Sequence, residues 1–416
     1  MTKRNHMVVQ RPKLRVLSAI GPGDVVSAHR DWLAGVRTVS ETSITFSSQE
    51  FDFFTKHRIP HWTISTHPAR TVVSDGANRI ENRPRAIEAT SGTVFHLSLL
   101  LYAISLLGSA IRFRATHAII DSGTTHWFAL SLFRLFGIQV HPNFHNVYWP
   151  DGHEPKRRPQ RAILRLDSLF LRAGVRSALG VSPECGRQVG VMSGGKTAFF
   201  DYRAQFVRGD FGTLPRPVLS TPMRIMFAGR VELNKGVFDI LIICEMLSKW
   251  QPGAFKFDIC GSGNALDELR SEITRRQLGS DLVLHGKLIR PDLLKVYGDS
   301  HLVIVPTRSS FCEGLPMVCA EAMIAGRPVI TSRLSNALVA LDGAVVEARA
   351  DDPADYAHKI ALLAQDPAHY ARLVKQTAVV SQQFTDPSFG LTSALEKCLL
   401  NRGNSDFAPS TKSRST

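Results

Sequence analysis

Two acidic residues lie close together in the second half of the chain, on either side of a predicted helix start. Glu313 stands in the run Phe-Cys-Glu-Gly-Leu-Pro that ends at Pro316, and seven residues separate it from Glu321. An apolar run at 302–305 predicts a strand before this loop, and Gly326 predicts the end of the helix. Both carboxylates are therefore expected at the carboxyl edge of a parallel sheet, where open α/β sheets bind ligands.

The start of this predicted helix also offers hydrogen-bond donors. Backbone N–H groups between Gly314 and Met317 would have no partner within the helix, and such groups attract anions. An anionic ligand is therefore expected beside Gly314, Leu315 and Pro316.

A second loop, bounded by Gly229 and Gly236, carries two cations between a predicted strand and a predicted helix. Arg230 and Lys235 stand five residues apart in it. Two positive charges at this spacing suit the two phosphates of a leaving diphosphate, whose charge must be neutralised as the bond breaks. Taken alone, such a pair is more often solvated surface charge.

A third loop follows the predicted strand at 255–260 and contains Gly261 and Gly263. The missing side chains would let a base or a ribose approach the backbone. A glycine pair after a strand is, however, more often structural, so this loop supports a ligand site only together with the other two.

The order of these three pieces resembles the C-terminal domain of the family 4 glycosyltransferases, also called glycosyl transferases group 1, which retain sugar configuration and have the GT-B fold. The resemblance covers residues 223–367 and includes Leu-His-Gly at 284–286 and Asp-Asp-Pro at 351–353. Asp351 and Asp352 look like a metal-binding pair, but their place before a helix favours capping.

The resemblance implies a role for each residue of the site. Arg230 and Lys235 would contact the diphosphate, Glu313 the transferred sugar, and Glu321 the ribose of the nucleotide. The resemblance also places four glycines and two residues before the predicted helix at the donor, all in the second half of the chain: Gly229, Gly261, Gly263, Gly314, Leu315 and Pro316.

The first half of the chain contributes weaker candidates. Gly21 and Gly23 follow the predicted strand at 14–20, and the resemblance implies that their loop reaches toward the donor phosphates. His145 stands at the carboxyl end of another predicted strand and resembles the family's cleft histidine, which implies a catalytic role. A structural role for a lone histidine is equally open.

Short apolar runs alternate with helix-like stretches along the whole chain, which predicts an α/β protein with parallel sheets. Together with the resemblance, this indicates a GT-B fold of two Rossmann-like, doubly wound domains facing a central cleft. The predicted units are an acceptor-binding domain at 12–206, a linker at 207–222, a nucleotide-sugar-binding domain at 223–400 and a disordered tail at 401–416. Predicted strands of the first half lie at 14–20, 43–46, 61–65, 117–121, 138–141 and 178–181, with helices at 126–136 and 161–173. Those of the second half lie at 223–228, 255–260, 282–284, 302–305, 328–331 and 344–346.

The composition fits this organisation. The chain has 416 residues, 44% of them hydrophobic, which is enough for two cores. Its six cysteines are scattered without metal-ligand spacing, and the basic start lacks the long apolar core of a secretory signal, so a reduced, cytoplasmic protein is expected. The apolar segment 93–111 is interpreted as a buried helix, with a membrane span as the alternative.

The net charge of +14 is concentrated in the first half. Residues 1–210 hold 27 Lys and Arg against 15 Asp and Glu, whereas the rest of the chain holds 23 against 21. Five arginines fall within one band of a predicted helix: Arg157, Arg161, Arg165, Arg172 and Arg176. The band is either a solvated face or a patch that docks peripherally to the anionic inner face of a membrane or to a phosphorylated acceptor.

The sequence thus predicts a hexosyltransferase-type enzyme (EC 2.4) that transfers a sugar, with retention, from a nucleotide-diphosphate sugar to a lipid-linked or glycan acceptor in cell-surface polysaccharide assembly. No metal and no cofactor are expected, because two cations can replace a divalent ion. The alternatives are a GT-B nucleotide-sugar epimerase and a basic nucleic-acid-binding protein. The second is disfavoured, because no nucleic-acid-binding motif accompanies the basic charge.

Overall fold

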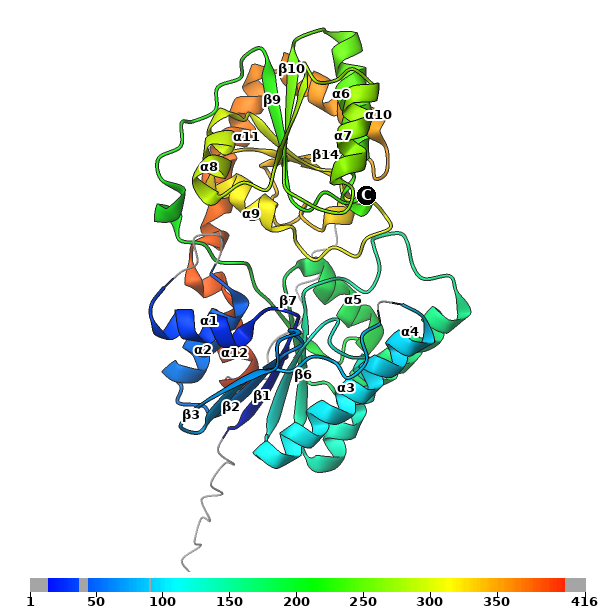
Figure 1. Ribbon diagram of the computed structural model, residues 1–416, viewed down its shortest axis with the longest axis vertical. Helices are drawn as coiled ribbons and strands as arrows, with labels where there is room; N and C mark the ends of the chain where they lie inside the picture. Colours follow the sequence, from blue (N-terminus) through cyan, green and yellow to red (C-terminus); the bar gives the residue numbers. More distant parts are fainter. Residues whose placement is uncertain (1–13, 37–43, 90, 401–416) are drawn as a thin grey trace, which may run out of the picture.

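The computed structural model describes residues 14–36, 44–89 and 91–400, which form two α/β domains, one above the other in Figure 1. Each domain has a twisted, largely parallel sheet with helices on both faces. The predicted GT-B fold of two Rossmann-like domains is therefore confirmed. The predicted tail at 401–416 and residues 12 and 13 lie outside the described residues.

The first sheet has the strand order β3-β4-β2-β1-β5-β6-β7-β8, and every neighbouring pair is parallel except β3 with β4. Its strands are β1 (Val16–Ile20), β2 (His61–Ser65), β3 (Thr71–Asp75), β4 (Asn78–Asn82), β5 (His117–Asp121), β6 (Gln139–Phe144), β7 (Ser177–Gly180) and β8 (Ala198–Asp201). The central strands β2 and β5 are buried throughout, and β1 is buried except at its last residue, as expected for a sheet covered on both faces.

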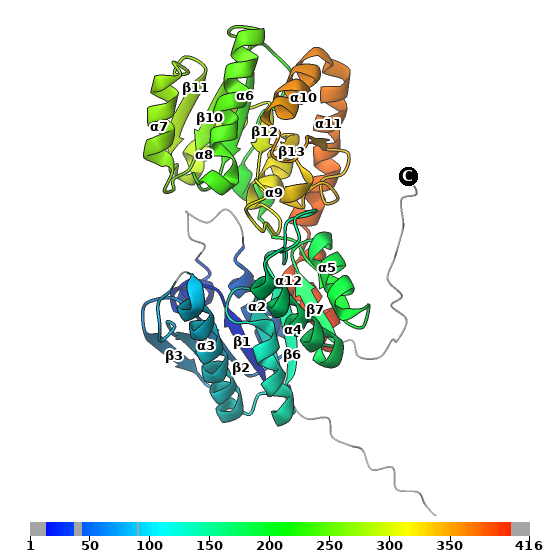
Figure 2. The ribbon, with the colours of Figure 1, turned by 90° about the vertical axis from the view of Figure 1, so that its right-hand side faces the viewer.

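Helices of the first domain cover this sheet from two sides. They are α1 (Val25–Leu33), α2 (Phe46–Lys56), α3 (Gly92–Phe113), the 3₁₀ helix η1 (Trp127–Phe136), α4 (Arg158–Gly174) and α5 (Pro183–Ser193). Figure 2 shows α3 and α4 in front of the sheet, and η1 packs against both of them. The chain then leaves the domain through the short η2 (Arg208–Phe211).

The second sheet has the order β11-β10-β9-β12-β13-β14, with all pairs parallel. Its strands are β9 (Met223–Ala228), β10 (Phe255–Cys260), β11 (Leu282–Gly286), β12 (Leu302–Val305), β13 (Val329–Thr331) and β14 (Val345–Glu347). Its helices are η3 (Leu233–Lys235), α6 (Val237–Trp250), α7 (Leu266–Arg275), α8 (Arg290–Asp299), α9 (Met317–Ile324), η4 (Arg333–Ser335), α10 (Pro353–Gln365) and α11 (Pro367–Val380). Separate apolar clusters fill its two faces, so this domain has its own core.

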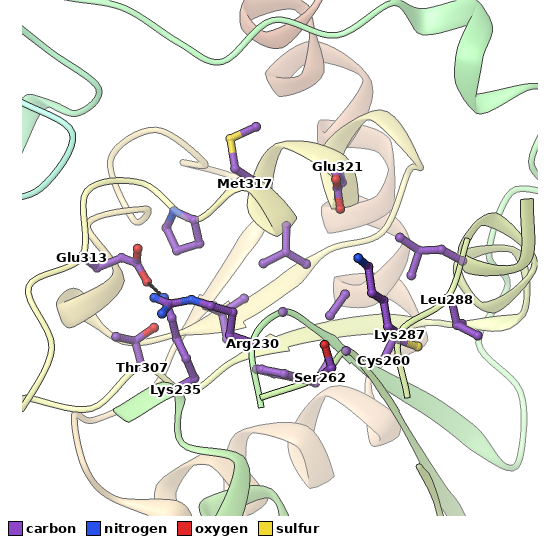
Figure 3. Close-up of a pocket in the computed structure, with 18 of the residues that line it drawn as sticks. Arg230, Lys235, Cys260, Ser262, Lys287, Leu288, Thr307, Glu313, Met317 and Glu321 are labelled. Carbon is purple, nitrogen blue, oxygen red and sulfur yellow. Dashed lines mark hydrogen bonds and ion pairs between the residues drawn. The ribbon is translucent and has the colours of Figure 1, made fainter. Parts of the chain in front are cut away.

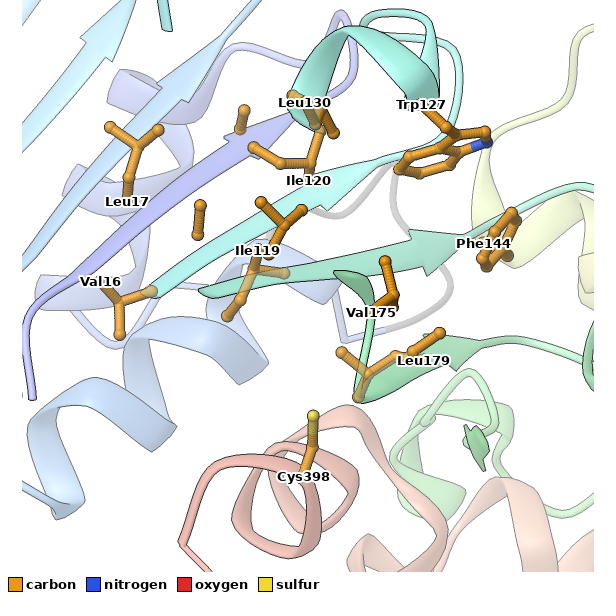
Figure 4. Packing of buried hydrophobic residues seen from close by; sticks show 14 of the residues in the cluster. Val16, Leu17, Ile119, Ile120, Trp127, Leu130, Phe144, Val175, Leu179 and Cys398 are labelled. Carbon is orange, nitrogen blue, oxygen red and sulfur yellow. The ribbon is translucent and has the colours of Figure 1, made fainter. Parts of the chain in front are cut away.

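The last helices return to the first domain. After η5 (Ser381–Phe384) and η6 (Pro387–Phe389), α12 (Leu391–Leu395) and the π-helix η7 (Glu396–Leu400) lie against it. Leu391, Leu395 and Leu399 belong to the same buried cluster as Val16, and Figure 4 shows Cys398 beside β7. The predicted end of the second domain at 400 is therefore wrong, because residues 391–400 bury their apolar side chains in the first core.

Most predicted strands coincide with observed ones, but the segment 43–46 does not form the strand predicted there. Ile44 makes a single bridge to Gln205, and the Thr45 side chain caps the N-terminus of α2. Residue 43 lies outside the described residues. The hairpin β3–β4 and the edge strand β8 were not predicted, because polar, partly exposed strands lack the apolar runs that identify buried ones.

The apolar segment interpreted as a buried helix forms α3, which lies on the first sheet. It is also the one helix in the described part of the chain that is long and apolar enough to cross a membrane, with 44% of its most apolar 18-residue window buried. Tyr102, Leu106 and Ala110 place one of its faces in the first core. The helix is therefore half inside the domain and half outside it.

Candidate functional site

A cavity of about 490 Å³ opens at the carboxyl ends of β9, β10 and β12, where loops of the second domain meet (Figure 3). The structure brings eight of the predicted residues together as its lining: Gly229, Arg230, Lys235, Gly261, Glu313, Leu315, Pro316 and Glu321. They come from segments almost 100 residues apart in the sequence. Only the parallel sheet, which ends all these strands at one edge, can assemble them.

Lys235 and Glu313 form an ion pair inside this cavity. The Lys235 ammonium donates to the Glu313 carboxylate and lies 4.1 Å from the centre of the Phe311 ring. The two side chains are only 16% and 10% exposed, so little solvent screens the pair. In Figure 3 this pair lies at one end of the cavity, and Lys287 and Glu321 lie toward the other.

Arg230 is placed at the exposed rim. Its side chain is 58% exposed, and its guanidinium donates to Glu232 over 2.8 Å. The guanidinium carbon also lies 5.7 Å from the centre of the Phe311 ring. Arg230 and Lys235 therefore approach the same ring, one from solvent and one from inside, and both can reach an anion bound between them.

Glu321 lies on α9 and is largely buried. One of its carboxylate oxygens accepts a hydrogen bond of 3.0 Å from the Tyr297 hydroxyl. Burial, reinforced by the negative charge of Glu321, raises the pKa of Tyr297 well above its usual value, so this hydroxyl stays a donor. The contact fixes the carboxylate at the cavity wall.

The glycines of the β9 and β10 loops allow those loops to touch. A Cβ atom at Gly261, whose φ is +145°, would collide with the carbonyl of Gly229. One at Gly263 would collide with the carbonyl of Val231, and Gly263 itself does not line the cavity. These glycines shape the cavity by close backbone packing, which is a different role from the ligand contact predicted for Gly263.

Two further residues of the cavity were missed in the sequence. Lys287 follows β11 directly and adds a third cation, and it could have been found because the predicted Leu-His-Gly segment ends at the residue before it. Thr307 follows β12, and its buried hydroxyl has no hydrogen-bond partner among the described residues. A threonine after a strand carries no sequence signal of its own.

His145 of the first domain lies where the two domains touch. Its Nε2 is 2.9 Å from a carboxylate oxygen of Asp121, while Asn143 donates to the other oxygen. Burial lowers the pKa of His145, but the Asp121 carboxylate outweighs it and holds this pKa above its usual value. The Asp121 carboxylate therefore favours the protonated, positively charged form of the imidazole.

The loop that carries Glu313 packs directly on this histidine segment. The Val147 amide donates to the Glu313 carbonyl over 3.4 Å, and a Cβ atom at Gly314 would collide with the His145 carbonyl. Gly314 is therefore a point of backbone contact between the domains and does not line the cavity. The contact places the backbone of His145 next to the loop of Glu313, although His145 does not line the cavity.

The glycines predicted to reach the donor from the first domain are not in this cavity. Gly21 lines a second cavity of about 710 Å³ at the carboxyl ends of β1, β2 and β5, and Gly23 lines neither cavity. The two cavities belong to different domains. The structure therefore does not bring these glycines to the predicted diphosphate.

The acidic pair considered for metal binding has other partners. Asp352 caps α10 by accepting from the Asp355 amide over 3.1 Å, as predicted. Asp351 instead accepts from the Ser309 amide over 3.1 Å and holds the loop after β12. Within the described ranges, no group of three His, Cys, Asp or Glu side chains could hold a metal ion.

The five predicted arginines do not form one helical band. Arg161, Arg165 and Arg172 lie exposed on α4, but Arg157 is the residue before the helix and Arg176 follows its end. The predicted periodicity therefore holds only for the three residues inside the helix.

Comparison with known proteins identifies the second domain. Residues 216–379 match the family described as glycosyl transferases group 1. The amylovoran biosynthesis glycosyltransferase AmsK of Erwinia amylovora is 28% identical over 124 residues, which are 29% of this chain and 30% of that protein. A D-inositol 3-phosphate glycosyltransferase of Corynebacterium kroppenstedtii is 31% identical over 152 residues, covering 34% and 33%. The matches thus span about a third of the length of these curated relatives.

Solved structures resemble the whole chain in fold. The sucrose-phosphate synthase of Thermosynechococcus elongatus has a TM-score of 0.66 at 16% identity, over 92% of this chain and 97% of that one. Anabaena Alr3699/HepE in complex with UDP has a TM-score of 0.62 at 12% identity, over 92% and 98%. At these identities the likeness concerns the fold alone. The second domain of this chain thus matches the glycosyl transferases group 1 family over residues 216–379, and the chain as a whole has the GT-B fold.

Proposed function

We propose that this chain is a retaining glycosyltransferase of the hexosyltransferase type, which transfers a sugar from a nucleotide-diphosphate sugar to a lipid-linked or glycan acceptor. The observation that carries this proposal is the cavity of the group 1 domain, which gathers Arg230, Lys235 and Lys287 with Glu313 and Glu321. Cations for a diphosphate and carboxylates for hydroxyl groups are the two kinds of side chain that such a donor requires.

The donor would lie along the cavity with its diphosphate between the cations. Glu321 would accept hydrogen bonds from the ribose, because its carboxylate is already fixed by Tyr297. Glu313 would contact the transferred sugar at the other end, beside Lys235. The solved relative HepE is described in complex with UDP and glucose, which supports a donor of this class.

Lys235 has the central role in the proposed reaction. As the bond between sugar and diphosphate breaks, negative charge grows on the leaving phosphate, and a preorganised, desolvated ammonium stabilises that charge. The acceptor hydroxyl would attack from the face that the diphosphate leaves and pass its proton to an oxygen of that diphosphate, which retains the sugar's configuration. Three cations supply the charge for which other transferases use a divalent ion, so we propose that the reaction needs no metal.

The acceptor would bind in the second cavity, in the first domain. Arg85 lines it and donates to the Gly123 carbonyl over 2.6 Å, while its buried Nε has no hydrogen-bond partner among the described residues. An acceptor oxygen or phosphate can supply that partner. His145 lies at the domain contact between the two cavities, where its positive charge can stabilise the reacting centre.

The names of two relatives support a proposed role in polysaccharide biosynthesis, which we take to be cell-surface polysaccharide assembly. AmsK is an amylovoran biosynthesis glycosyltransferase, and WcaL of Escherichia coli is a putative colanic acid biosynthesis glycosyltransferase. We further propose that the enzyme is cytoplasmic and acts in peripheral contact with the inner face of a membrane.

The proposal is tested by incubating the protein with a panel of UDP, GDP and dTDP sugars and following the products by mass spectrometry. We expect one donor to be hydrolysed slowly or transferred, and Lys235→Ala to abolish that turnover. Lys249→Ala, which removes an exposed lysine of the same domain, is the matched control. Conversion of a donor into its epimer would favour the epimerase alternative, and no turnover of any donor would refute the proposal.

A further inference from the structure

One face of the first domain exposes an unusual amount of apolar surface. Five aliphatic side chains of α3, each between 40% and 58% exposed, recur every three to seven residues along one side of the helix: Val94, Leu97, Leu101, Ile104 and Ile111. We call these residues the α3 stripe. The side chains that α3 contributes to the core lie on the opposite side of the helix, so among the described residues of this domain the stripe is left largely uncovered.

The neighbouring elements continue this surface. On η1, which packs against α3, Leu135 is 79% exposed and Phe136 is 56% exposed. On α4, which packs against η1, Leu166 and Leu169 are also exposed. Figure 2 shows α3 and α4 on the same side of the sheet. Exposed apolar side chains therefore occur on three adjacent elements on this side of the sheet.

The charges on this face are all positive. Across α3, η1 and α4, all of which lie in described ranges, Asp167 is the single acidic residue, and it is buried while accepting from the Phe128 amide over 2.9 Å. Exposed arginines surround the apolar side chains: Arg112, Arg114, Arg134, Arg161, Arg165 and Arg172. Apolar side chains beside unopposed cations are the composition of a surface that binds anionic membranes.

Four cationic side chains line a hollow at the end of this face. It has a volume of about 420 Å³, lies between the ends of η1 and α4 and the starts of β6 and β7, and is lined by Arg134, Arg172, Arg176 and Lys196. Its described lining includes no Asp or Glu. We call it the cationic hollow. A cation near a helix C-terminus stabilises the helix by interacting with its dipole. The C-termini of η1 and α4 alone do not account for four cations around one cavity.

The arginines of the hollow are held in place by the backbone around them. The Arg172 Nε donates to the Met192 carbonyl over 3.0 Å. The Arg134 side chain crosses Gly174, where a Cβ atom would lie 2.7 Å from its Cδ. Leu135 and Phe136 follow Arg134 directly, so the apolar surface begins at the rim of the hollow. This arrangement suits a phosphate group that carries an apolar chain.

We propose that this face docks on an anionic lipid bilayer, with the α3 stripe and η1 among the acyl chains and the cationic hollow around a lipid phosphate. A second copy of the chain fits less well, because a symmetric contact would place the same arginines against each other. Each Lys or Arg near an anionic surface contributes about 1 kcal/mol to binding. The use of this face for delivering a lipid-linked acceptor depends on the proposed transferase function, whereas lipid binding itself can be measured without transfer.

The test is sedimentation of the full chain with vesicles of phosphatidylcholine, or of equal parts phosphatidylcholine and phosphatidylglycerol. We expect binding to the anionic vesicles alone at low salt. Arg176→Gln with Lys196→Gln should weaken it roughly tenfold to thirtyfold, because two charges leave the hollow. The matched control is Arg270→Gln with Lys295→Gln, which removes two exposed charges from the second domain and should bind as the wild type does.

A second variant tests the apolar part. Leu97→Ser with Leu101→Ser and Ile104→Ser should reduce anionic vesicle binding, whereas Val283→Ser with Val339→Ser, at exposed sites of the second domain, should not. Wild-type protein that ignores anionic vesicles at low salt would overturn the proposal. So would a wild-type dimer in light scattering that the stripe variant converts to a monomer. Donor hydrolysis, measured without lipid, reports separately on the transferase proposal.

Discussion

The two domains share one architecture but use their charges in different ways. In the second domain the important charges point inward: Lys235 and Glu313 pair inside a cavity, and Glu321 is buried against Tyr297. In the first domain the excess charge points outward, on arginines of α3, η1 and α4 that surround exposed apolar side chains. Under the two proposals above, the same fold would bind an anionic donor in one domain and an anionic bilayer with the other.

The two proposed roles would constrain the sequences of the two domains differently. The matched family covers residues 216–379 and so omits the first domain. A cavity for one class of donor constrains residue types at fixed loop positions. A docking surface constrains only composition, because many arrangements of arginine and leucine bind a membrane equally well.

The largest effect is expected at Lys235. Replacing it with alanine should lower turnover about a hundredfold or more, because the ammonium stabilises charge that grows as the diphosphate leaves. Thermal unfolding should change little, and Lys249→Ala should match the wild type in both measurements. If Lys235→Ala turned over the donor at the wild-type rate, the role proposed for the Lys235 ammonium at the leaving diphosphate would be wrong.

The two acidic residues should divide binding from chemistry. Glu321→Gln loses a charged hydrogen-bond partner of the ribose, which is worth about 1.5 to 3 kcal/mol, so the donor KM should rise about tenfold or more. Glu313→Gln should instead lower mainly kcat, because Glu313 contacts the sugar whose charge changes during transfer. Steady-state kinetics of both variants test this difference. If Glu313→Gln and Glu321→Gln lost donor affinity equally, the proposed division of roles would be wrong.

A smaller effect is expected at Arg85, in the cavity of the first domain. Arg85→Ala removes the unpartnered buried Nε that we assign to the acceptor, and should raise the acceptor KM about fivefold to tenfold while leaving the donor KM unchanged. Arg79→Ala, which removes a partly exposed arginine of the same sheet, is the control. If Arg85→Ala changes the donor KM as much as the acceptor KM, the two cavities do not have separate ligands.

The smallest effect concerns stability of the first domain. Burial, together with the charge of Asp121, raises the pKa of Glu50 to about 8, although the Ser18 hydroxyl opposes this by donating to it. Between pH values of about 4.5 and 8, the folded protein therefore keeps a proton that the unfolded chain releases, and stability falls as pH rises. Glutamine at this position does not titrate, so the stability of Glu50→Gln should not fall in this way. Its Tm relative to that of the wild type should therefore be a few degrees higher at pH 9 than at pH 5. An equal Tm difference at both pH values would contradict the assignment.

Much of the fold followed from the sequence because buried parallel strands produce apolar runs, as in β5 and β12. The hairpin β3–β4 and the strand β8 could not be found in this way, since their partly exposed residues alternate without a clear pattern. The return of residues 391–400 to the first core was equally hidden. An apolar helix does not reveal which of two cores will bury it.

The candidate site was predictable where residue type and loop position act together. Arg230, Lys235, Glu313 and Glu321 stand in loops whose positions follow from the strands before them. The buried hydroxyl of Thr307 and the contact between Gly314 and His145 depend on how the loops and the domains pack, which single-sequence patterns do not encode. The cationic hollow arises in the same way, from ends of η1 and α4 that meet only in the folded domain.

The central claim is that the second domain alone binds the nucleotide part of the donor. Calorimetric titration of the wild type with UDP, GDP and dTDP, in parallel with Glu321→Gln and Arg85→Ala, tests it most directly. We predict that one nucleotide binds the wild type, that Glu321→Gln weakens this binding about tenfold or more, and that Arg85→Ala leaves it unchanged. Binding of no nucleotide, or a loss in Arg85→Ala as large as that in Glu321→Gln, would contradict it.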